Sequence, residues 1–411
     1  PARISGQGRD IAVDNEPVED APIRLTAFAA SFAAEAKDSP SPVSGEDSDD
    51  QPVAAGGTFQ HLADGDLRGV AASACVPGGS EAWIVAGSTE PGSSARLLLT
   101  NPGFTTIWAD LELWDGAGKR EAMGLTGLTI LPGTQKAVLL EGIVADAGRL
   151  AVHATASGGD LAVFLQHSRL EGLTPGGIEL ATPGALPATE VVVPGLNVTS
   201  STFDSVRTSA LRILSTGTED ANVSVELWGP DGPTSLPGLE EAVLHPEVVT
   251  DLSLGGLPGG HYTAVITSDQ PVVAAALSLR AGEVDQPEEF AWTASALPSE
   301  QGYVALPTAD LSYQLVAAAA TDAQLEVRTV SLEGDLGEPE TVELSGQTTE
   351  SFDPAALGAD QETVALQFRW LGGPGWLGLL VSASDEAGEM ISALVPPALG
   401  AGWAEVRVYP R

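Results

Sequence analysis

The sequence predicts an all-β protein of three tandem immunoglobulin-like β-sandwich modules, related by an internal repeat and preceded by an irregular acidic segment. Short stretches rich in Leu, Val, Ile and Trp alternate with Gly, Pro, Asn, Asp and Ser, which is the pattern of strands and turns. No amphipathic helical stretch interrupts them, so alternating βαβ units are disfavoured. A chain of 411 residues is also too long for one hydrophobic core.

The repeat is clearest in a strand that ends in Leu-Trp. Leu113 and Trp114 end its first copy, and Leu227 and Trp228 end its second copy 114 positions further along (227 − 113 = 114). A weaker third copy begins at Leu315. The number of strands in each copy fits a sandwich. A propeller would need a repeat of about 45 residues per blade, which the sequence does not show.

These copies define four expected regions. Residues 1–66 form the N-terminal segment with an acidic Pro/Ser linker, and the modules follow at 67–190, 191–300 and 301–411. Within the first region, 23–32 is predicted as a strand or a short helix. The stretch 38–52 has too few apolar residues to offset the entropy of ordering it, so it is predicted as a linker or an exposed loop.

The second module is expected to close with a hairpin. Tyr262–Thr267 and Pro271–Leu277 read as its two strands, and Ser268-Asp-Gln-Pro271 reads as its turn. The last residues of the chain, Trp403–Tyr409, alternate apolar and polar side chains and predict a terminal strand.

The charge excludes some partners. The chain has 56 acidic and 18 basic residues and a net charge of −38, so nucleic acid is not an expected partner and anionic membrane surfaces would repel it. Solubility at an exposed surface is one interpretation of this charge, and binding of Ca²⁺ is another. Asp64-Gly-Asp66 and Glu46–Asp50 are weak Ca²⁺ candidates, because neither has the EF-hand spacing.

The sequence shows no motif for catalysis, and no catalytic, cofactor or metal residue is predicted. The five histidines lack metal-ligand spacing, and no nucleophile elbow or phosphate loop occurs. His153 is expected on a solvent-facing strand position and His167 at a strand edge. Cys75 is the single cysteine and is predicted to be a small buried hydrophobe. A hydrolase with two carboxylates across a cleft stays open as an alternative.

Four residues are the candidate contact site for a partner or glycan. Strand alternation directs Leu111 and Leu113 inward and therefore places Glu112 and Trp114 on the opposite face. Glu226 and Trp228 recur at the same place in the second copy. An exposed Trp at a repeated position stacks on a sugar or anchors a partner, or it packs against the adjacent module or a returning loop.

The chain also resembles a known family through several blocks of sequence. These blocks are Cys75 with Trp83-Ile-Val-Ala-Gly87, Leu99-Thr-Asn-Pro-Gly103, Leu131-Pro-Gly-Thr134, Asp269-Gln-Pro-Val-Val-Ala-Ala-Ala276 and Phe290-Ala-Trp-Thr293. They are similar to those of exported proteins from high-GC Gram-positive bacteria catalogued as domain of unknown function 5719, over roughly residues 65 to 400.

The resemblance implies where the protein is located and what its partners are, but it implies no catalytic reaction. It implies an extracellular cell-surface protein, anchored to the cytoplasmic membrane by a segment upstream of Pro1, whose partner is a membrane-embedded glycosyltransferase or another envelope protein. The expected function is therefore a non-catalytic scaffold or accessory subunit in surface glycan or lipoglycan assembly. A glycan-binding or adhesive surface module, with surface polysaccharide as its partner, is the alternative. The family assigns no catalytic residues.

Overall fold

The structure is a computed structural model that describes residues 30–32 and 53–397, except 206, 281–286, 307–310 and 332–334. The prediction of an all-β protein is confirmed, because the helices in these residues are two short 3₁₀ turns, η1 (Leu140–Gly142) and η2 (Pro354–Leu357). No described helix has the length and hydrophobicity needed to cross a membrane. The predicted linker 38–52 and the predicted terminal strand 403–409 both lie entirely outside the described residues.

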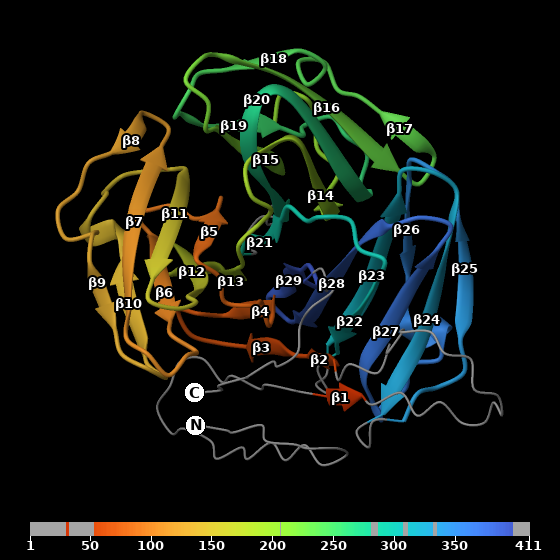
Figure 1. The fold of residues 1–411 in the computed structure, drawn as a ribbon. Coiled ribbons are helices and arrows are strands. Elements are labelled where there is room, and N and C mark those ends of the chain that lie inside the picture. The colour runs from red at the N-terminus through yellow and green to blue at the C-terminus, as the bar shows by residue number, and fades with distance from the viewer. Residues whose placement is uncertain are drawn as a thin grey trace, which may run out of the picture.

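The strands form three successive units after a short N-terminal group (Figure 1). The N-terminal group is β1 (Ala30–Phe32), β2 (Val53–Ala55), β3 (Gly57–Leu62) and β4 (Gly69–Ala74). Unit 1 comprises β5 (Glu81–Ile84), β6 (Ser93–Thr100), β7 (Ile107–Asp115), β8 (Gly118–Arg120), β9 (Leu128–Ile130), β10 (Gln135–Leu139), β11 (Leu150–Ser157), β12 (Ala162–Glu171) and β13 (Thr174–Ala181).

Units 2 and 3 repeat this order of strands. Unit 2 comprises β14 (Ala188–Val198), β15 (Ala210–Ser215), β16 (Ala221–Gly229), β17 (Gly232–Thr234), β18 (Ala242–Leu244), β19 (Val249–Ser253), β20 (Gly260–Arg280) and β21 (Glu289–Ala294). Unit 3 comprises β22 (Gln301–Ala305), β23 (Ser312–Ala319), β24 (Ala323–Ser331), β25 (Glu340–Leu344), β26 (Thr348–Phe352), β27 (Thr363–Leu371), β28 (Gly375–Asp385) and β29 (Gly388–Leu394).

Each unit has two groups of paired strands, which we name the central sheet and the flanking sheet. The central sheets have the orders β10-β6-β12-β13, β19-β15-β20-β21 and β26-β23-β28-β29. The flanking sheets have the orders β5-β11-β7-β8, β14-β20-β16-β17 and β22-β27-β24-β25. The equivalent orders show that the internal repeat extends through all three units.

The repeat is preserved even at one strained turn. The turn lies before the edge strand of each central sheet, that is, before β10, β19 and β26. It contains Gly133 in unit 1, Glu247 in unit 2 and Gln347 in unit 3. All three have a φ near +60°, and each donates its backbone N–H to the end of the equivalent strand. A left-handed conformation is unfavourable for residues other than Gly, so its recurrence reflects a shared turn.

The predicted hairpin in unit 2 is wrong. Gly260–Arg280 is one extended strand, β20, whose first half pairs with β14 and β16 in the flanking sheet and whose second half pairs with β15 and β21 in the central sheet. The polar residues before Pro271 lie where β20 passes between the two sheets. Pro has no N–H to donate, and such a crossing point tolerates it. The equivalent strands of unit 1, β11 and β12, likewise pair with different sheets.

The units do not follow one another as separate sandwiches; their sheets form a propeller-like ring (Figure 1). The last strand of each central sheet reaches the middle of the ring, where β13, β21 and β29 meet β4, and each of these four strands contacts the next. The hairpin β3–β4 thus supplies a fourth inner position. The sequence disfavoured a propeller because it shows no repeat of about 45 residues. That test missed the ring, because the repeated unit here is much longer and contains two sheets.

Two of the three expected domain boundaries fall inside structural elements. The position 66/67 lies within the β3–β4 hairpin, the position 190/191 lies within β14, and the position 300/301 immediately precedes β22.

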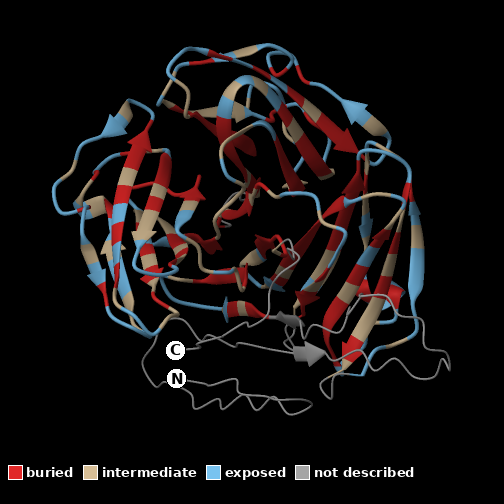
Figure 2. Ribbon diagram, in the orientation of Figure 1, coloured by how far each residue is buried: buried red, intermediate tan, exposed pale blue. Residues whose placement is uncertain are grey.

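Burial follows strand alternation and then departs from it where units meet (Figure 2). Along β7, the residues Ile107, Ala109, Leu111 and Leu113 are buried in the sandwich. Trp114 is buried as well, although it points to the other face. The flanking sheet of unit 1 is therefore covered on both faces at this end, with unit 2 contributing to the same core cluster.

Candidate functional site

The structure buries the two tryptophans of the predicted contact site. Trp114 and Trp228 are 5% and 4% exposed, so of the two alternatives that the sequence left open, their burial favours packing over contact by an exposed ring. The direction of both side chains, away from the core of their own unit, agrees with strand alternation. What covers Trp228 is unit 3, because its ring centroid lies 6.0 Å from that of Trp376 in an edge-to-face arrangement. Trp228 therefore packs against the adjacent unit, which is one of the alternatives that the sequence left open.

Trp114 belongs to a cluster of aromatic and charged side chains on the same sheet. Its ring stacks on Trp83 at a centroid distance of 5.3 Å, and Lys119 lies over it at 5.2 Å. The ring of His153 stacks on that of Trp83 at a centroid distance of 4.1 Å. Its Nδ1 is hydrogen-bonded to Oε2 of Glu112 at 3.0 Å. The bonds of Glu112 to Lys119 and His153 lower the pKa of its carboxyl. Glu112 is thus engaged within the sheet, and Glu226 is partly buried at the equivalent place in unit 2.

A buried carboxylate joins the inner strands at the middle of the ring. Glu179 on β13 accepts the N–H of Leu180 at 2.8 Å and the hydroxyl of Ser392 on β29 at 2.8 Å and 2.9 Å. Ser392 in turn accepts the N–H of Ala72 on β4 at 2.8 Å. The backbone of Trp292 on β21 also bonds to Glu179. Burial raises the pKa of Glu179 to about 8, against these bonds, which lower it.

Glu179 is expected to make stability depend on pH. Its folded pKa of about 8 lies above the usual value of 4.5, so between these values the folded state holds a proton that the unfolded state has lost. Its contribution is complete below pH 4.5 and is lost as the pH rises towards 8. Lowering the pH from 7 to 5.5 should raise the free energy of unfolding by about 2 kcal/mol through this group.

Urea unfolding of Glu179→Gln at both pH values measures this contribution. The variant should lose this part of the pH dependence, whereas Glu190→Gln, which removes an exposed carboxylate of β14, should keep it. A full wild-type pH dependence in Glu179→Gln would contradict the assignment.

A second polar cluster lies at one end of the inner strands. Arg68, just before β4, donates to Glu289 on β21 at 2.8 Å and to both carboxylate oxygens of Asp385, at 2.7 Å and 3.0 Å. It also donates to the carbonyl of Gly388 at 2.9 Å. Burial raises the pKa of Glu289 to about 8, with Arg68 acting in the opposite direction. This cluster ties the N-terminal hairpin to units 2 and 3.

His167 and Arg212 connect unit 1 to unit 2. From the sequence, His167 was misplaced and Arg212 was not identified. His167 is fully buried on β12, which has β6 on one side and β13 on the other, so it is not at a sheet edge as expected. It accepts the indole N–H of Trp292 at 3.1 Å. Burial is the main reason that the pKa of His167 lies well below its usual value. The guanidinium carbon of Arg212 lies 4.6 Å from the ring centroid of Trp292. Its Nη2 donates to the carbonyl of Gly148 at 3.1 Å.

A cleft of about 550 Å³ opens between units 1 and 2, at the β12–β13 turn. Its charged lining residues are Arg169, Arg207, Glu90, Glu171 and Glu288. Arg207 pairs with Glu288 at 2.7 Å and with Glu171 at 3.5 Å. Burial raises the pKa of Glu288, against the effect of the two arginines. Because two of the three carboxylates are ion-paired, the cleft fits a polar joint between units better than an acid–base pair for hydrolysis.

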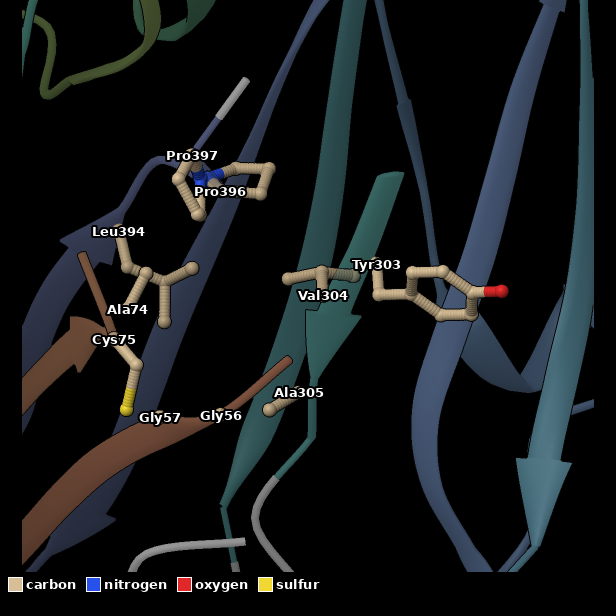
Figure 3. Close-up of a pocket in the computed structure, with 10 residues that line it drawn as sticks. All are labelled: Gly56, Gly57, Ala74, Cys75, Tyr303, Val304, Ala305, Leu394, Pro396 and Pro397. Carbon is tan, nitrogen blue, oxygen red and sulfur yellow. The ribbon is translucent and has the colours of Figure 1, made fainter. Parts of the chain in front are cut away.

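Cys75 lies beside a small pocket at the end of β4 (Figure 3). The pocket is closed by Val304 on β22 and by Leu394 at the end of β29, and its volume of about 10 Å³ holds one water molecule at most. Burial raises the pKa of the thiol to about 11, so it is protonated at neutral pH. Cys75 is only partly buried at the residue level, so the prediction of a fully buried side chain is not met, although its protonated thiol fits a packing role.

The candidate Ca²⁺ sites gain no support from the described residues. No group of three or more His, Cys, Asp or Glu side chains in this part of the chain is placed to hold a metal ion. Asp64 and Asp66 lie exposed in the β3–β4 turn, and the run 46–50 is outside the described residues.

One exposed aromatic side chain remains on the flanking sheet of unit 1. Trp108, near the start of β7, is 49% exposed and points to the same face as Glu112 and Trp114. Its neighbours across the sheet are Ser157 on β11 and Thr129 on β9. Trp114, at the far end of this face, is buried beside Trp83, whereas Trp108 is open, so this end is the candidate surface for recognition. The sequence placed Trp108 in no site.

The sequence blocks that carry the family resemblance occupy turns and joints between units. Asn101 is buried and donates to the carbonyls of Thr105 and Ile130 at 2.7 Å and 3.0 Å, which holds two loops together. Asp269 accepts the N–H of Asn222 at 2.9 Å. The block 290–293 forms the inner strand β21. These residues therefore have structural roles in the fold.

Comparison with known proteins places the chain in a family. No curated protein and no solved structure matches it. Residues 31–355 match the family of unknown function DUF5719, a span that runs from β1 through β26 of unit 3 and so begins earlier and ends earlier than the sequence blocks suggested. The match covers well over half of the 411 residues, and the chain belongs to this family of unknown function.

Proposed function

We propose that this protein is a non-catalytic, extracytoplasmic component of the cell envelope that serves as a scaffold or accessory subunit of a membrane glycosyltransferase in surface glycan or lipoglycan assembly. The observation that supports this proposal is that the polar side chains which converge inside the protein bond to one another across the inner strands. Glu179, Arg68 and Glu289 are buried and bonded between inner strands, so they hold the ring together. Recognition is then left to the outer surface, which is the role of a scaffold.

The charge is consistent with this role. A net charge of −38 keeps a surface protein soluble and disfavours direct adhesion to anionic lipid. Exposed large apolar side chains are present on unit 1, including Phe104, Met123 and Leu131. Such residues are typical of contact surfaces when they gather at one place.

Purification from native membranes tests the proposal. The tagged protein, extracted in mild detergent with its lipids retained, should recover an integral membrane enzyme of glycan assembly. An equally acidic secreted protein carrying the same tag is the control. Recovery of the protein alone, at detergent concentrations that preserve other membrane complexes, would count against the scaffold function.

A glycan-binding surface module is the second candidate function. Trp114 and Trp228 cannot serve it as first expected, because their rings are covered. The specific observation that favours it is the open ring of Trp108, which is taken further below.

A further inference from the structure

We propose that the open end of the unit 1 flanking sheet binds a neutral polysaccharide, with Trp108 as the platform for one sugar ring. This inference rests on the second of the two functions proposed above. It names a residue, a surface and a class of ligand. The surface is defined by Trp108, Ser157, Thr129, Thr105 and Asp110, all of which are exposed.

The backbone beside Trp108 holds the indole in place. Gly158 has a φ of +89°, and a Cβ atom at this glycine would lie 3.2 Å from Cζ3 of Trp108. The ring therefore rests against a main chain that has no side chain to displace it. Thr105 donates its hydroxyl to the carbonyl of Gly158 at 2.9 Å and fixes this turn. A positioned aromatic ring loses little conformational entropy when a ligand stacks on it.

The groups around the ring match the chemistry of a sugar. One face of a pyranose presents C–H bonds, which pack on an aromatic face, while its hydroxyls need hydrogen-bond partners at the rim. Ser157 and Thr129 flank Trp108 on the two neighbouring strands and present hydroxyls at the rim. The hydroxyl of Ser157 donates to the carbonyl of Trp108 at 3.5 Å and remains an acceptor. Asp110, two residues further along β7, accepts the N–H of Gly127 with Oδ1 at 2.6 Å, and its second oxygen, Oδ2, adds an acceptor at the rim.

The electrostatics select an uncharged ligand. Asp110 and Glu112 lie on this face of β7, and Glu81 lies on the neighbouring edge of the sheet. Lys119 is the cation beside them, and it is already paired with Glu112. A polymer of uronic acids or sugar phosphates would meet these carboxylates unfavourably.

The other two units act as internal controls for this site. The residue equivalent to Trp108 is Asn222 in unit 2 and Gln324 in unit 3. The side-chain amide of Asn222 donates to Asp269 at 2.5 Å, and that of Gln324 donates to Glu343 at 2.7 Å. The same backbone position thus carries a bonded amide in two units and an open aromatic ring in one, so the fold does not require the tryptophan.

Affinity electrophoresis of the purified chain through gels containing dextran, mannan or laminarin, with alginate as the anionic comparison, tests the site. At least one neutral polysaccharide should retard the wild-type protein, and alginate should not. Trp108→Asn, which places the unit 2 residue in unit 1, should lower the association constant at least about tenfold. Trp108→Phe should keep part of the binding, since it keeps an aromatic face. Leu139→Ala, at a side chain of similar exposure (47%), should bind as the wild type does.

Two results would overturn the inference. One is a wild-type protein that none of the neutral polysaccharides retards. The other is a Trp108→Asn variant that keeps its thermal unfolding midpoint and is retarded as strongly as the wild type. Trp108→Gln, with the unit 3 residue, provides a second variant if the first does not fold. The assay contains no membrane protein, so its failure leaves the scaffold function standing. Loss of a co-purified membrane protein on Trp108→Asn, without sugar binding, would assign the surface to a protein contact instead.

Discussion

Replacing Trp228 by alanine is expected to lower the free energy of unfolding by about 3 to 5 kcal/mol. The side chain fills the joint between units 2 and 3, where it meets Trp376 and is grouped with Val192 and Ala318. Truncation removes this apolar contact and leaves a cavity that the two sheets cannot close without moving. Trp228→Phe should cost much less, because it keeps the ring contact and removes an indole N–H that has no hydrogen-bond partner among the described residues.

Denaturant unfolding of single and double variants measures whether this contact joins the units. Trp228→Ala and Trp376→Ala should show a coupling energy of about 0.5 to 1.5 kcal/mol in a double-mutant cycle. Units that fold as separate sandwiches would show no coupling between these two positions.

Replacing Arg68 by methionine is expected to cost a similar amount, about 3 to 5 kcal/mol. The substitution leaves Glu289 buried without its cation and frees Asp385 from its partner. Burial raises the pKa of Glu289 to about 8 even though Arg68 lowers it, so removing Arg68 raises this pKa further and lets the carboxyl of the variant take up a proton where that of the wild type does not. The loss should therefore be largest above pH 8 and smaller near pH 6.

Urea unfolding at pH 6 and pH 8.5 measures this effect. The double variant Arg68→Met/Glu289→Gln removes the uncompensated charge and should recover much of the loss at the higher pH. Arg149→Met is a suitable control, since Arg149 is a partly exposed arginine whose pairing with Asp251 is long, at 3.7 Å. An equal loss in the single and double variants would contradict the role given to the buried charge.

The sequence predicted the class of fold and the repeat because both depend on local patterns. Alternation along β7 gave the direction of Glu112 and Trp114, and turn residues separated the strands correctly around it. The spacing of the Leu-Trp strands revealed the equivalence of units 1 and 2, which the strand orders confirm. These inferences need only residues that are neighbours in the chain or in one strand.

The ring and the fate of the predicted site could not be obtained in this way. Whether the outward face of β16 meets solvent or a neighbouring unit depends on contacts such as Trp228 with Trp376, which are distant in sequence. His167 is buried because β13 pairs beside it. Glu179 is an acidic residue in an otherwise apolar inner strand, and this local inconsistency was the one signal that could have pointed to the central network.

The central claim is that the repeats close into one ring held by their inner strands, with recognition left to the outside. Small-angle X-ray scattering of the full chain in solution tests this most directly. A compact ring of this length should have a radius of gyration of about 22 Å. A row of three sandwich modules, each about 13 Å in radius of gyration, would give a value above about 30 Å and would contradict the account.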